Sequence, residues 1–230
     1  MTERILAVVA HPDDEVLGVG GTLARYASAQ IPVNVIILGE GATSRDTGVG
    51  GNVHRSSVPL LVDAAKKAAN ILGYLPPHHA HLPDNKLDTL PLLDIIRHIE
   101  PIIDKFKPTR VYTHHGGDLN IDHRITHEAV VTACRPIPKS IIRGLYAFET
   151  LSSTEWRPAS TAIPFSPNRF VDVTPQLDQK IRALNCYAEE IAPFPHARSI
   201  QAVTALAHLR GASVGLEAAE AFSVIREIES

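Results

Sequence analysis

The chain is poor in sulfur and in aromatic residues. Its 230 residues include two cysteines, one methionine and one tryptophan, and Phe, Trp and Tyr together make up 5%. Two cysteines are too few for a disulfide framework, and they are not spaced for a structural zinc site with four closed ligands. The fold must therefore rest on a hydrophobic core, which a composition of 44% hydrophobic residues can supply.

The chain also has no large excess of charge of one sign and no long apolar run. The 22 Lys and Arg residues nearly balance the 25 Asp and Glu residues, so a nucleic-acid surface is not expected. No apolar stretch approaches the ~18 residues that a membrane-spanning helix needs. The short apolar run at the N-terminus ends at His11 without the features of a signal peptide. We therefore expect a cytoplasmic protein without a membrane span.

Histidine, by contrast, is abundant, with 12 residues. It is the commonest metal ligand and the usual general acid or base near neutral pH. The histidine count points to a metal site, and the position of each histidine in the fold must decide which of them take part.

Strand and helix patterns alternate along the first two thirds of the chain. Strands are predicted at 5–9, 33–38, 110–113 and 144–149, and helices at 16–29, 57–72, 90–106, 122–133, 174–190 and 199–210. This alternation is typical of right-handed βαβ units. We predict an α/β fold, a Rossmann-like single domain over residues 1–230, with a mostly parallel sheet and helices on both faces.

The first cluster of reactive side chains comes directly after the first predicted strand. The segment 11–15 reads His-Pro-Asp-Asp-Glu, and open parallel sheets bind ligands beyond the carboxyl ends of their strands. His11 and Asp14 can reach one cation while Asp13 points elsewhere, because consecutive side chains on a turn diverge. Capping of the following helix is the alternative reading, and it explains one or two of the acids but not His11.

A second cluster, which ends at His123, follows the strand at 110–113. If these two strands are neighbours, His11, Asp14 and His123 meet at the same edge of the sheet. Two histidines and one carboxylate with open positions are typical of hydrolytic zinc sites and of some non-haem iron sites. We expect Zn²⁺, with Fe²⁺ as the alternative. A cation there lowers the pKa of bound water towards 7, which makes Asp13 the natural general base.

These two motifs together resemble the LmbE/PIG-L family of metal-dependent N-acetylglucosaminyl deacetylases. The resemblance implies that His11, Asp14 and His123 hold zinc and that Asp13 is the base. Segments 82–85, 152–156 and 194–199 resemble the polysaccharide-cluster branch, so the likeness covers essentially the whole chain. It implies a zinc-dependent N-deacetylase that hydrolyses the amide of a small-molecule N-acetyl amino-sugar conjugate, linked to a nucleotide or another carrier.

The second motif departs from the family pattern at Asn120. Many members have a histidine there, which acts as a protonated electrophile or acid helper and is oriented by the aspartate, here Asp122. Asn120 can donate a hydrogen bond to an oxyanion but cannot deliver a proton. His114 or His115 can take the missing role, or the base can return the proton by itself.

Two arginines are candidate substrate contacts. Arg45 follows the second predicted strand and borders the same edge of the sheet, although a solvated loop arginine explains it equally well. Arg198 is suggested by the resemblance alone. The sequence identifies neither the sugar nor its carrier, and it leaves open whether the chain forms a homo-oligomer.

Two functions of other classes are compatible with the same fold. A non-catalytic sugar-nucleotide-binding protein would keep the pocket, but the complete set of metal ligands and base argues against it. A metal-dependent glycosyltransferase would use Asp13 and Asp14 to hold Mg²⁺ or Mn²⁺ through oxygen ligands. The two histidines disfavour that reading.

Overall fold

The computed structural model describes residues 2–42 and 58–229, and within them seven strands form one sheet in the order β3-β2-β1-β4-β5-β7-β6. The strands are β1 (Ile5–Val9), β2 (Val33–Gly39), β3 (His78–Leu82), β4 (Arg110–His114), β5 (Gly144–Phe148), β6 (Arg169–Asp172) and β7 (Ala219–Glu227). The α-helices are α1 (Asp14–Ser28), α2 (Val58–Leu72), α3 (Leu92–Phe106), α4 (Ile121–Ala133), α5 (Leu177–Leu184) and α6 (Ile200–Ala212). Short 3₁₀ turns are η3 (Leu87–Thr89), η4 (Thr174–Gln176) and η5 (Asn185–Tyr187).

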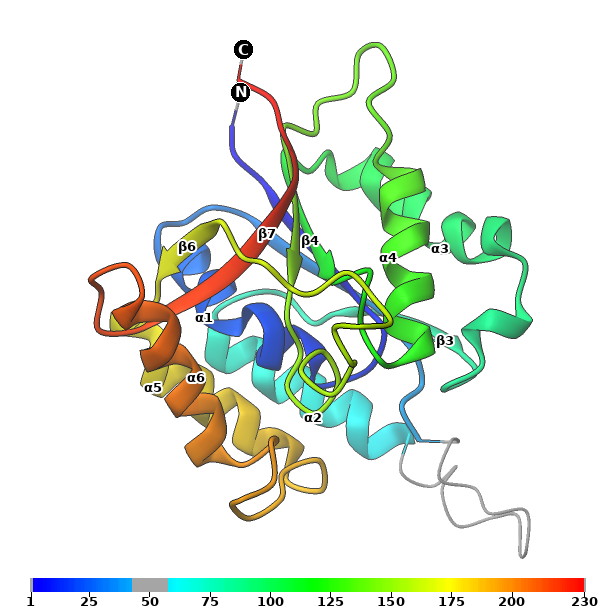
Figure 1. Ribbon diagram of the computed structural model, residues 1–230. Helices are drawn as coiled ribbons and strands as arrows, with labels where there is room; N and C mark the ends of the chain where they lie inside the picture. Colours follow the sequence, from blue (N-terminus) through cyan, green and yellow to red (C-terminus); the bar gives the residue numbers. More distant parts are fainter. Residues whose placement is uncertain (1, 43–57, 230) are drawn as a thin grey trace, which may run out of the picture.

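Strand β1 is the point from which the sheet extends in two directions. The strands from β3 through β2, β1 and β4 to β5 are parallel, and β7 runs antiparallel to both β5 and β6. The chain leaves β1 for β2 and β3 on one side, then crosses to β4 on the other side (Figure 1). A crevice for a ligand is expected at such a reversal, beyond the carboxyl ends of β1 and β4.

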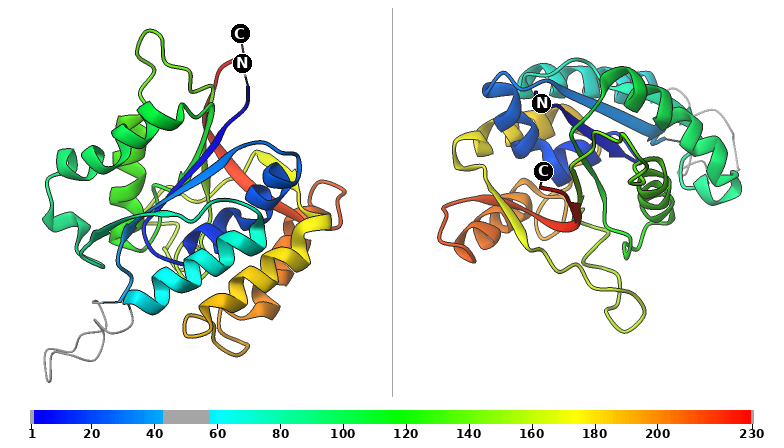
Figure 2. Two further views of the ribbon diagram at one scale, coloured as in Figure 1. Left: turned by 180° about the vertical axis from the view of Figure 1, so that it is seen from behind. Right: turned by 90° about the horizontal axis from the view of Figure 1, so that it is seen from above.

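Helices cover both faces of the sheet, as predicted. Alternate residues of β1 enter two separate cores, because successive side chains of a strand point to opposite faces. Val9 lies in the core shared with α1, α2, α5 and α6, whereas Val8 lies in the core shared with α3 and α4. Both views of Figure 2 show these two helical layers, with the sheet between them. The α/β class, the single domain and the mostly parallel sheet are confirmed.

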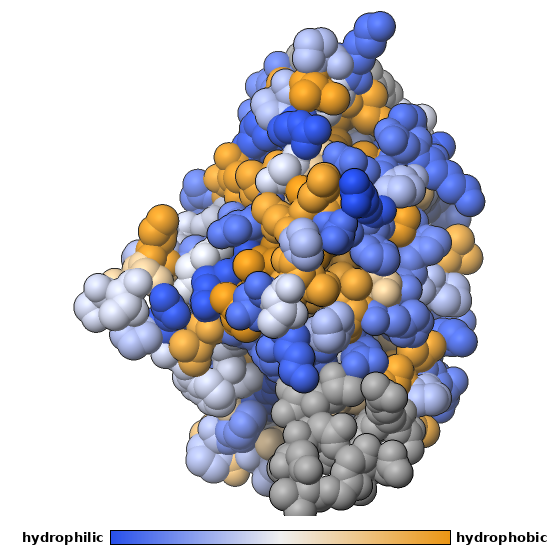
Figure 3. Space-filling model, turned by 90° about the vertical axis from the view of Figure 1, so that its right-hand side faces the viewer, coloured by the Kyte–Doolittle hydropathy of each residue, from blue (hydrophilic) through white to orange (hydrophobic). Residues whose placement is uncertain are grey.

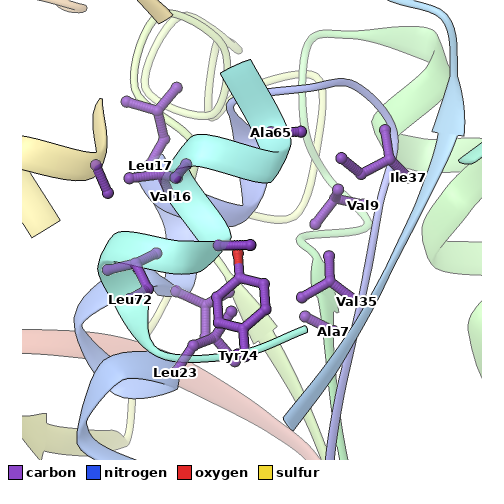
Figure 4. Packing of buried hydrophobic residues seen from close by; sticks show 14 of the residues in the cluster. Ala7, Val9, Val16, Leu17, Leu23, Val35, Ile37, Ala65, Leu72 and Tyr74 are labelled. Carbon is purple, nitrogen blue, oxygen red and sulfur yellow. The ribbon is translucent and has the colours of Figure 1, made fainter. Parts of the chain in front are cut away.

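The larger core shows why α1 lies so close to the sheet. Val9 and Ile37 project from the strands towards Leu17 of α1, and Ala65 of α2 closes the layer (Figure 4). Gly18 of α1 faces Phe148 of β5, and a Cβ atom at this glycine would overlap the aromatic ring. The glycine therefore allows the first turns of α1, which carry acidic residues, to lie directly against the sheet.

A buried ion pair enters the middle of α1. Lys180 Nζ of α5 lies 2.6 Å from Glu220 Oε1 of β7, and both side chains are almost completely buried. Glu220 accepts hydrogen bonds from the backbone N–H groups of Gly21 and Thr22 at 2.8 and 2.7 Å. Lys180 donates to the carbonyl oxygen of Leu17 at 2.8 Å. The pair thus ties the helix to both of its neighbours through backbone groups.

The structure differs from the sequence-based prediction at one helix and at three strands, β3, β6 and β7. The helix expected at 174–190 is divided into η4, α5 and η5, and the α-helical part is confined to Leu177–Leu184. Strand β7 was not predicted, because its alanines and glutamates favour helix over strand. Pairing with β5 on one side and β6 on the other decides its conformation.

The outer surface over α3 and α4 carries apolar and polar residues side by side (Figure 3). Leu93 and Ile137 are among the large apolar residues that are exposed to solvent. None of the helices that the structure describes has the length and hydrophobicity required to span a bilayer.

Candidate metal and catalytic site

Parallel pairing of β1 with β4 brings the two sequence motifs together. His11 follows β1, Asp14 begins α1, and His123 lies in the first turn of α4, after the short loop that follows β4. One ligand atom from each of these three residues lies within 4.8 Å of the others, and all three residues are buried. The structure therefore assembles the three residues that the sequence singled out, and we call them the metal cluster.

Asp14 is the centre of this cluster. Its Oδ2 atom lies 3.3 Å from His11 Nδ1 and 3.3 Å from His123 Nε2. The same oxygen accepts a hydrogen bond from the backbone N–H of His11 at 2.8 Å, which fixes the carboxylate against the loop.

Two atoms of the metal cluster provide a test of whether a cation fits. Asp14 Oδ1 and His123 Nε2 are buried, and neither forms a hydrogen bond within the described part of the chain. Buried polar atoms are rarely left in this state. A cation held by the two histidine nitrogens and the carboxylate would satisfy both atoms, so the residues fit a divalent metal.

Carboxylates also contact the second ring nitrogen of each histidine, the one that does not face Asp14. His11 Nε2 lies 3.1 Å from Asp122 Oδ2 and 3.2 Å from Asp84 Oδ1. His123 Nδ1 lies 3.2 Å from Asp118 Oδ1. Metal-binding histidines commonly use their second nitrogen in this way, which sets the tautomer and orientation of the ring.

His11, Asp84 and Asp122 also lie close enough to one another to suggest a second metal group. The oxygens of Asp122, however, already accept hydrogen bonds from the backbone N–H groups of Asn85 at 2.7 Å and Leu87 at 3.0 Å. These bonds hold the carboxylate as an acceptor for His11. We therefore assign Asp122 and Asp84 to orientation of the histidine.

The charges around the metal cluster favour a cation. Burial would lower the pKa of His11, but hydrogen bonds to Asp122, Asp14 and Asp84 raise it well above its usual value. Burial likewise opposes protonation of His123, and Asp14 and Asp118 raise its pKa. Carboxylates that stabilise the protonated, positively charged histidines would also stabilise a metal ion that replaces those protons.

Asp13 points away from Asp14, as the turn predicts. Its backbone has φ of 100°, a conformation that separates the two neighbouring side chains. The carboxylate is 2% exposed, and its Oδ2 atom accepts a hydrogen bond from Arg198 Nη1 at 2.8 Å. Burial raises the pKa of Asp13 to about 7, and the positive charge of Arg198 opposes the rise. A group with this pKa can accept and return a proton near neutral pH.

Asn120 is the N-cap residue of α4. Its Oδ1 atom accepts a hydrogen bond from the backbone N–H of Asp122 at 2.8 Å. The cap uses the amide oxygen and fixes the orientation of the side chain, so the Nδ2 group remains as the donor end.

The two histidines considered for proton donation occupy different surroundings. His114 Nε2 accepts a hydrogen bond from the backbone N–H of Ala10 at 2.9 Å and lies 3.4 Å from Asp14 Oδ2. Burial and the nearby His123 lower the pKa of His114 to about 4, so the ring is a poor proton donor. His115 is directed elsewhere, with its Nε2 atom 2.9 Å from the carbonyl oxygen of Ile163. Within the described contacts, the structure does not bring His115 to the metal cluster.

Several residues at the site were missed from the sequence. Asp118 receives hydrogen bonds from Ser153 and from Thr154 Oγ1, the latter at 2.6 Å. Asp84 and the pair Ser153 and Thr154 lie in segments that were noted only for their resemblance, and no spacing pattern marks Asp118. Arg198 is placed next to Asp13, whereas Arg45 lies outside the described residues.

Comparison with solved structures identifies the fold. The 4-carboxy-2-hydroxymuconate hydratase GalB from Pseudomonas putida KT2440 superposes with a TM-score of 0.79 and 20% identity, over 99% of this chain and 98% of that chain. At this level of identity the likeness concerns the fold alone.

Sequence comparisons are more specific. "Uncharacterized deacetylase YaiS" of Escherichia coli strain K12 is 32% identical over 174 residues, which cover 74% of this chain and 81% of the relative. "Probable N-acetyl-alpha-D-glucosaminyl L-malate deacetylase 2" of Bacillus anthracis is 27% identical over 191 residues, or 82% of each chain. A family profile described as "PIG-L: GlcNAc-PI de-N-acetylase" matches residues 6–134, which contain every residue of the metal cluster and Asp13. With more than half of its length matched in this way, the chain belongs to the PIG-L family.

Proposed function

We propose that the chain, acting as one unit over residues 1–230, is a metal-dependent hydrolase that removes the acetyl group from an N-acetylated amino-sugar conjugate. The observation that carries this proposal is the metal cluster with its two unsatisfied buried atoms, next to a buried Asp13 whose pKa lies near 7. Membership of a family of de-N-acetylases supports the same reaction class.

His11 Nδ1, the Asp14 carboxylate and His123 Nε2 would hold Zn²⁺, with Fe²⁺ as the alternative that such ligands also accept. When bound, the metal polarises a carbonyl oxygen and lowers the pKa of a bound water. Asp118 and Asp122 orient the two histidines so that their inner nitrogens face Asp14.

Asp13 serves as the general base and then as the general acid. It removes a proton from the attacking water and passes that proton to the leaving amine, which requires a pKa near the working pH. Because His114 is a poor donor and Asn120 carries no transferable proton, we assign both proton transfers to Asp13. Asn120 Nδ2 is proposed to donate a hydrogen bond to the developing oxyanion.

The proposed substrate class is an N-acetylglucosaminyl conjugate. The Bacillus anthracis relative carries such a substrate in its name, and its match extends over most of both chains. Linkage of the sugar to a nucleotide or another carrier, contact with Arg45, and a cytoplasmic location remain predictions from the sequence.

The test is a screen for acetate release by metal-reconstituted protein. Candidate substrates are UDP- and dTDP-linked N-acetyl sugars, free N-acetylglucosamine and N-acetylglucosaminyl glycosides. The assay must measure acetate itself, because the fold is shared with a hydratase. We expect one tightly held zinc or iron and release of acetate from at least one conjugate. A metal-free protein that binds sugar nucleotides without turnover would instead indicate a binding protein.

The variant Asp13→Ala tests the assigned base. We expect a loss of about 10²–10⁴-fold in turnover, the usual contribution of a general acid–base residue, with the metal content unchanged. Asp104→Ala is a matched control, because Asp104 is an exposed carboxylate of α3. Near-normal hydrolysis by Asp13→Ala would contradict the assignment.

A further inference from the structure

The chain has a single tryptophan, and it lies in an exposed position beside the site. Trp156 is 51% exposed, and its ring meets the exposed ring of His196 edge to face, with centroids 6.0 Å apart and an interplanar angle of 84°. An exposed tryptophan leaves a large apolar surface in water, which is unfavourable unless a partner covers it.

Trp156 is connected to the side of the site that holds His123. Its backbone N–H donates to the carbonyl oxygen of Ser153 at 3.3 Å. Ser153 in turn donates through its hydroxyl to Asp118, the carboxylate that orients His123. Trp156 thus belongs to the turn that supports one of the metal-cluster histidines.

His196 is connected to the other side of the site. Its Nδ1 atom accepts a hydrogen bond from the backbone N–H of Arg198 at 3.0 Å, and the Arg198 guanidinium donates to Asp13. Arg198 Nε also donates to Ser152 Oγ at 2.6 Å, which joins the two loops directly. The two rings therefore belong to two loops that Arg198 connects to each other and to Asp13.

The polar groups around these rings are suited to a carbohydrate. Ser152, Glu155 and Arg198 lie in the same two loops and offer hydrogen-bond donors and acceptors beside an apolar aromatic face. A pyranose ring has the matching pattern, with C–H groups on its faces and hydroxyl groups around its edge. Sugar and ligand sites commonly combine aromatic surface with a few polar groups in this way.

We propose that Trp156 and His196 form an outer subsite that binds a second pyranose ring, the one attached to the acetamido sugar. This inference rests on the proposed function, because the acetamido group must reach Asp13 and the metal cluster. The contacts that join this pair to the site run from His196 through Arg198 to Asp13, and from Trp156 through Ser153 and Asp118 to His123. We therefore assign the aromatic pair to the next unit of the substrate. The enzyme would accordingly prefer a glycoside to the free monosaccharide.

Fluorescence provides a direct test, since all tryptophan emission arises from Trp156. Metal-loaded Asp13→Asn protein, which is expected to bind without turnover, is titrated with N,N′-diacetylchitobiose, N-acetylglucosamine and acetate. We expect a saturable change of emission with the disaccharide, half-saturation at a concentration about tenfold higher for the monosaccharide, and no change with acetate. A tenfold difference is the size expected for one favourable ring contact.

Kinetics of acetate release test the same subsite with turnover. Trp156→Ala should raise KM for the disaccharide about tenfold more than KM for the monosaccharide, with a smaller change in kcat. Trp156→Phe, which keeps an aromatic face, should recover most of the affinity. Leu209→Ala is the control, because Leu209 is a similarly exposed apolar residue on α6.

The outcomes separate the subsite from the proposed reaction. An emission change with the disaccharide but no acetate release from either sugar would reject the deacetylation and retain the subsite. Acetate release with equal KM values for wild type and Trp156→Ala would reject the subsite and retain the reaction. Emission that responds to neither sugar would also reject the subsite.

Discussion

Arg198 Nη1 donates a hydrogen bond to Asp13 Oδ2 at 2.8 Å, although the two residues are 185 positions apart in the sequence. Arg198 also lies 3.5 Å from Glu190 Oε2 and donates to Ser152 Oγ, so its guanidinium is held on three sides. The proposed base is thus positioned by a loop that contributes no residue to the metal cluster.

Replacement of this arginine should reduce turnover while the metal remains bound. We expect Arg198→Ala to lower kcat by about ten- to a hundredfold, the equivalent of ~1.5–3 kcal/mol for a charged hydrogen bond. Arg198→Lys should recover part of the loss, since it restores the charge but not the planar fork. Acetate release and metal content measure the two effects separately. Loss of metal in Arg198→Ala would show a structural role instead.

Asp118 should control metal affinity without binding the metal itself. It is held by Ser153 and Thr154, and its own contact with His123 Nδ1 lowers its pKa to about 2 against the opposing effect of burial. We expect Asp118→Asn to weaken zinc binding about 10–100-fold, the usual effect of losing the carboxylate behind a metal-binding histidine. Competition with a chromophoric chelator gives the affinity, and Asp104→Asn is the control. Unchanged affinity would contradict the orienting role.

The two partners of the buried ion pair should differ in their tolerance of substitution. Removing one partner of such a pair typically costs ~3–5 kcal/mol in the free energy of unfolding. Lys180→Met leaves Glu220 with two backbone donors, whereas Glu220→Ala leaves a buried ammonium with one carbonyl acceptor. We therefore expect Glu220→Ala to be the more destabilising change in urea unfolding. Equal losses, or losses no larger than for exposed Lys67→Met, would contradict this account.

The two cysteines should differ in reactivity. Burial raises the pKa of Cys134 to about 12, whereas Cys186 is partly exposed and burial raises its pKa less strongly. At pH 8 we expect iodoacetamide to modify Cys186 first and Cys134 only after unfolding, because the thiolate is the reactive form. Mass spectrometry of the modified peptides measures both rates.

The raised pKa of Cys134 should also make the stability of the fold depend on pH. The thiol of Cys134 loses its proton near pH 9 in the unfolded chain and near pH 12 in the folded one, so folding retains the proton. Its contribution to the free energy of unfolding is complete below pH 9 and is lost as the pH rises towards 12. Cys134→Ala should reduce the slope of stability against pH in this interval. An unchanged slope would be the contrary result.

The parallel strands β1, β2, β4 and β5 could be predicted because they are largely buried on both faces. Strands such as Ile5–Val9 are therefore continuous apolar runs. The parallel strand β3 was not predicted, since it lies at the edge of the sheet and is partly exposed. Strand β7 could not be predicted either, since its Ala- and Glu-rich sequence favours a helix and only tertiary pairing makes it a strand. The predicted bounds of the helix at 174–190 were wrong for a similar reason. The helix α5 packs against α1 and α2, and these tertiary contacts are not encoded in the local sequence pattern.

At the site, too, some residues could be predicted from the sequence and others could not. His11, Asp14 and His123 could be predicted to meet because each stands at the carboxyl end of a neighbouring parallel strand. Asp84 and Asp118 could not, since their contacts with the histidines depend on loop conformations that no periodic pattern encodes. The environment of His114 could not be predicted either, because it depends on a hydrogen bond from the backbone N–H of Ala10.

The reversal of direction at β1 affects when the cation can be acquired. His11 and Asp14 lead into the half of the sheet that contains β2 and β3, whereas His123 belongs to the half that begins with β4. A growing polypeptide on the ribosome carries the first two ligands long before the third is synthesised. All three ligands could therefore bind the cation together only after β4 has paired with β1. The bound ion would then stabilise the pairing of β1 with β4, by an amount that grows with the logarithm of the ion concentration relative to its dissociation constant.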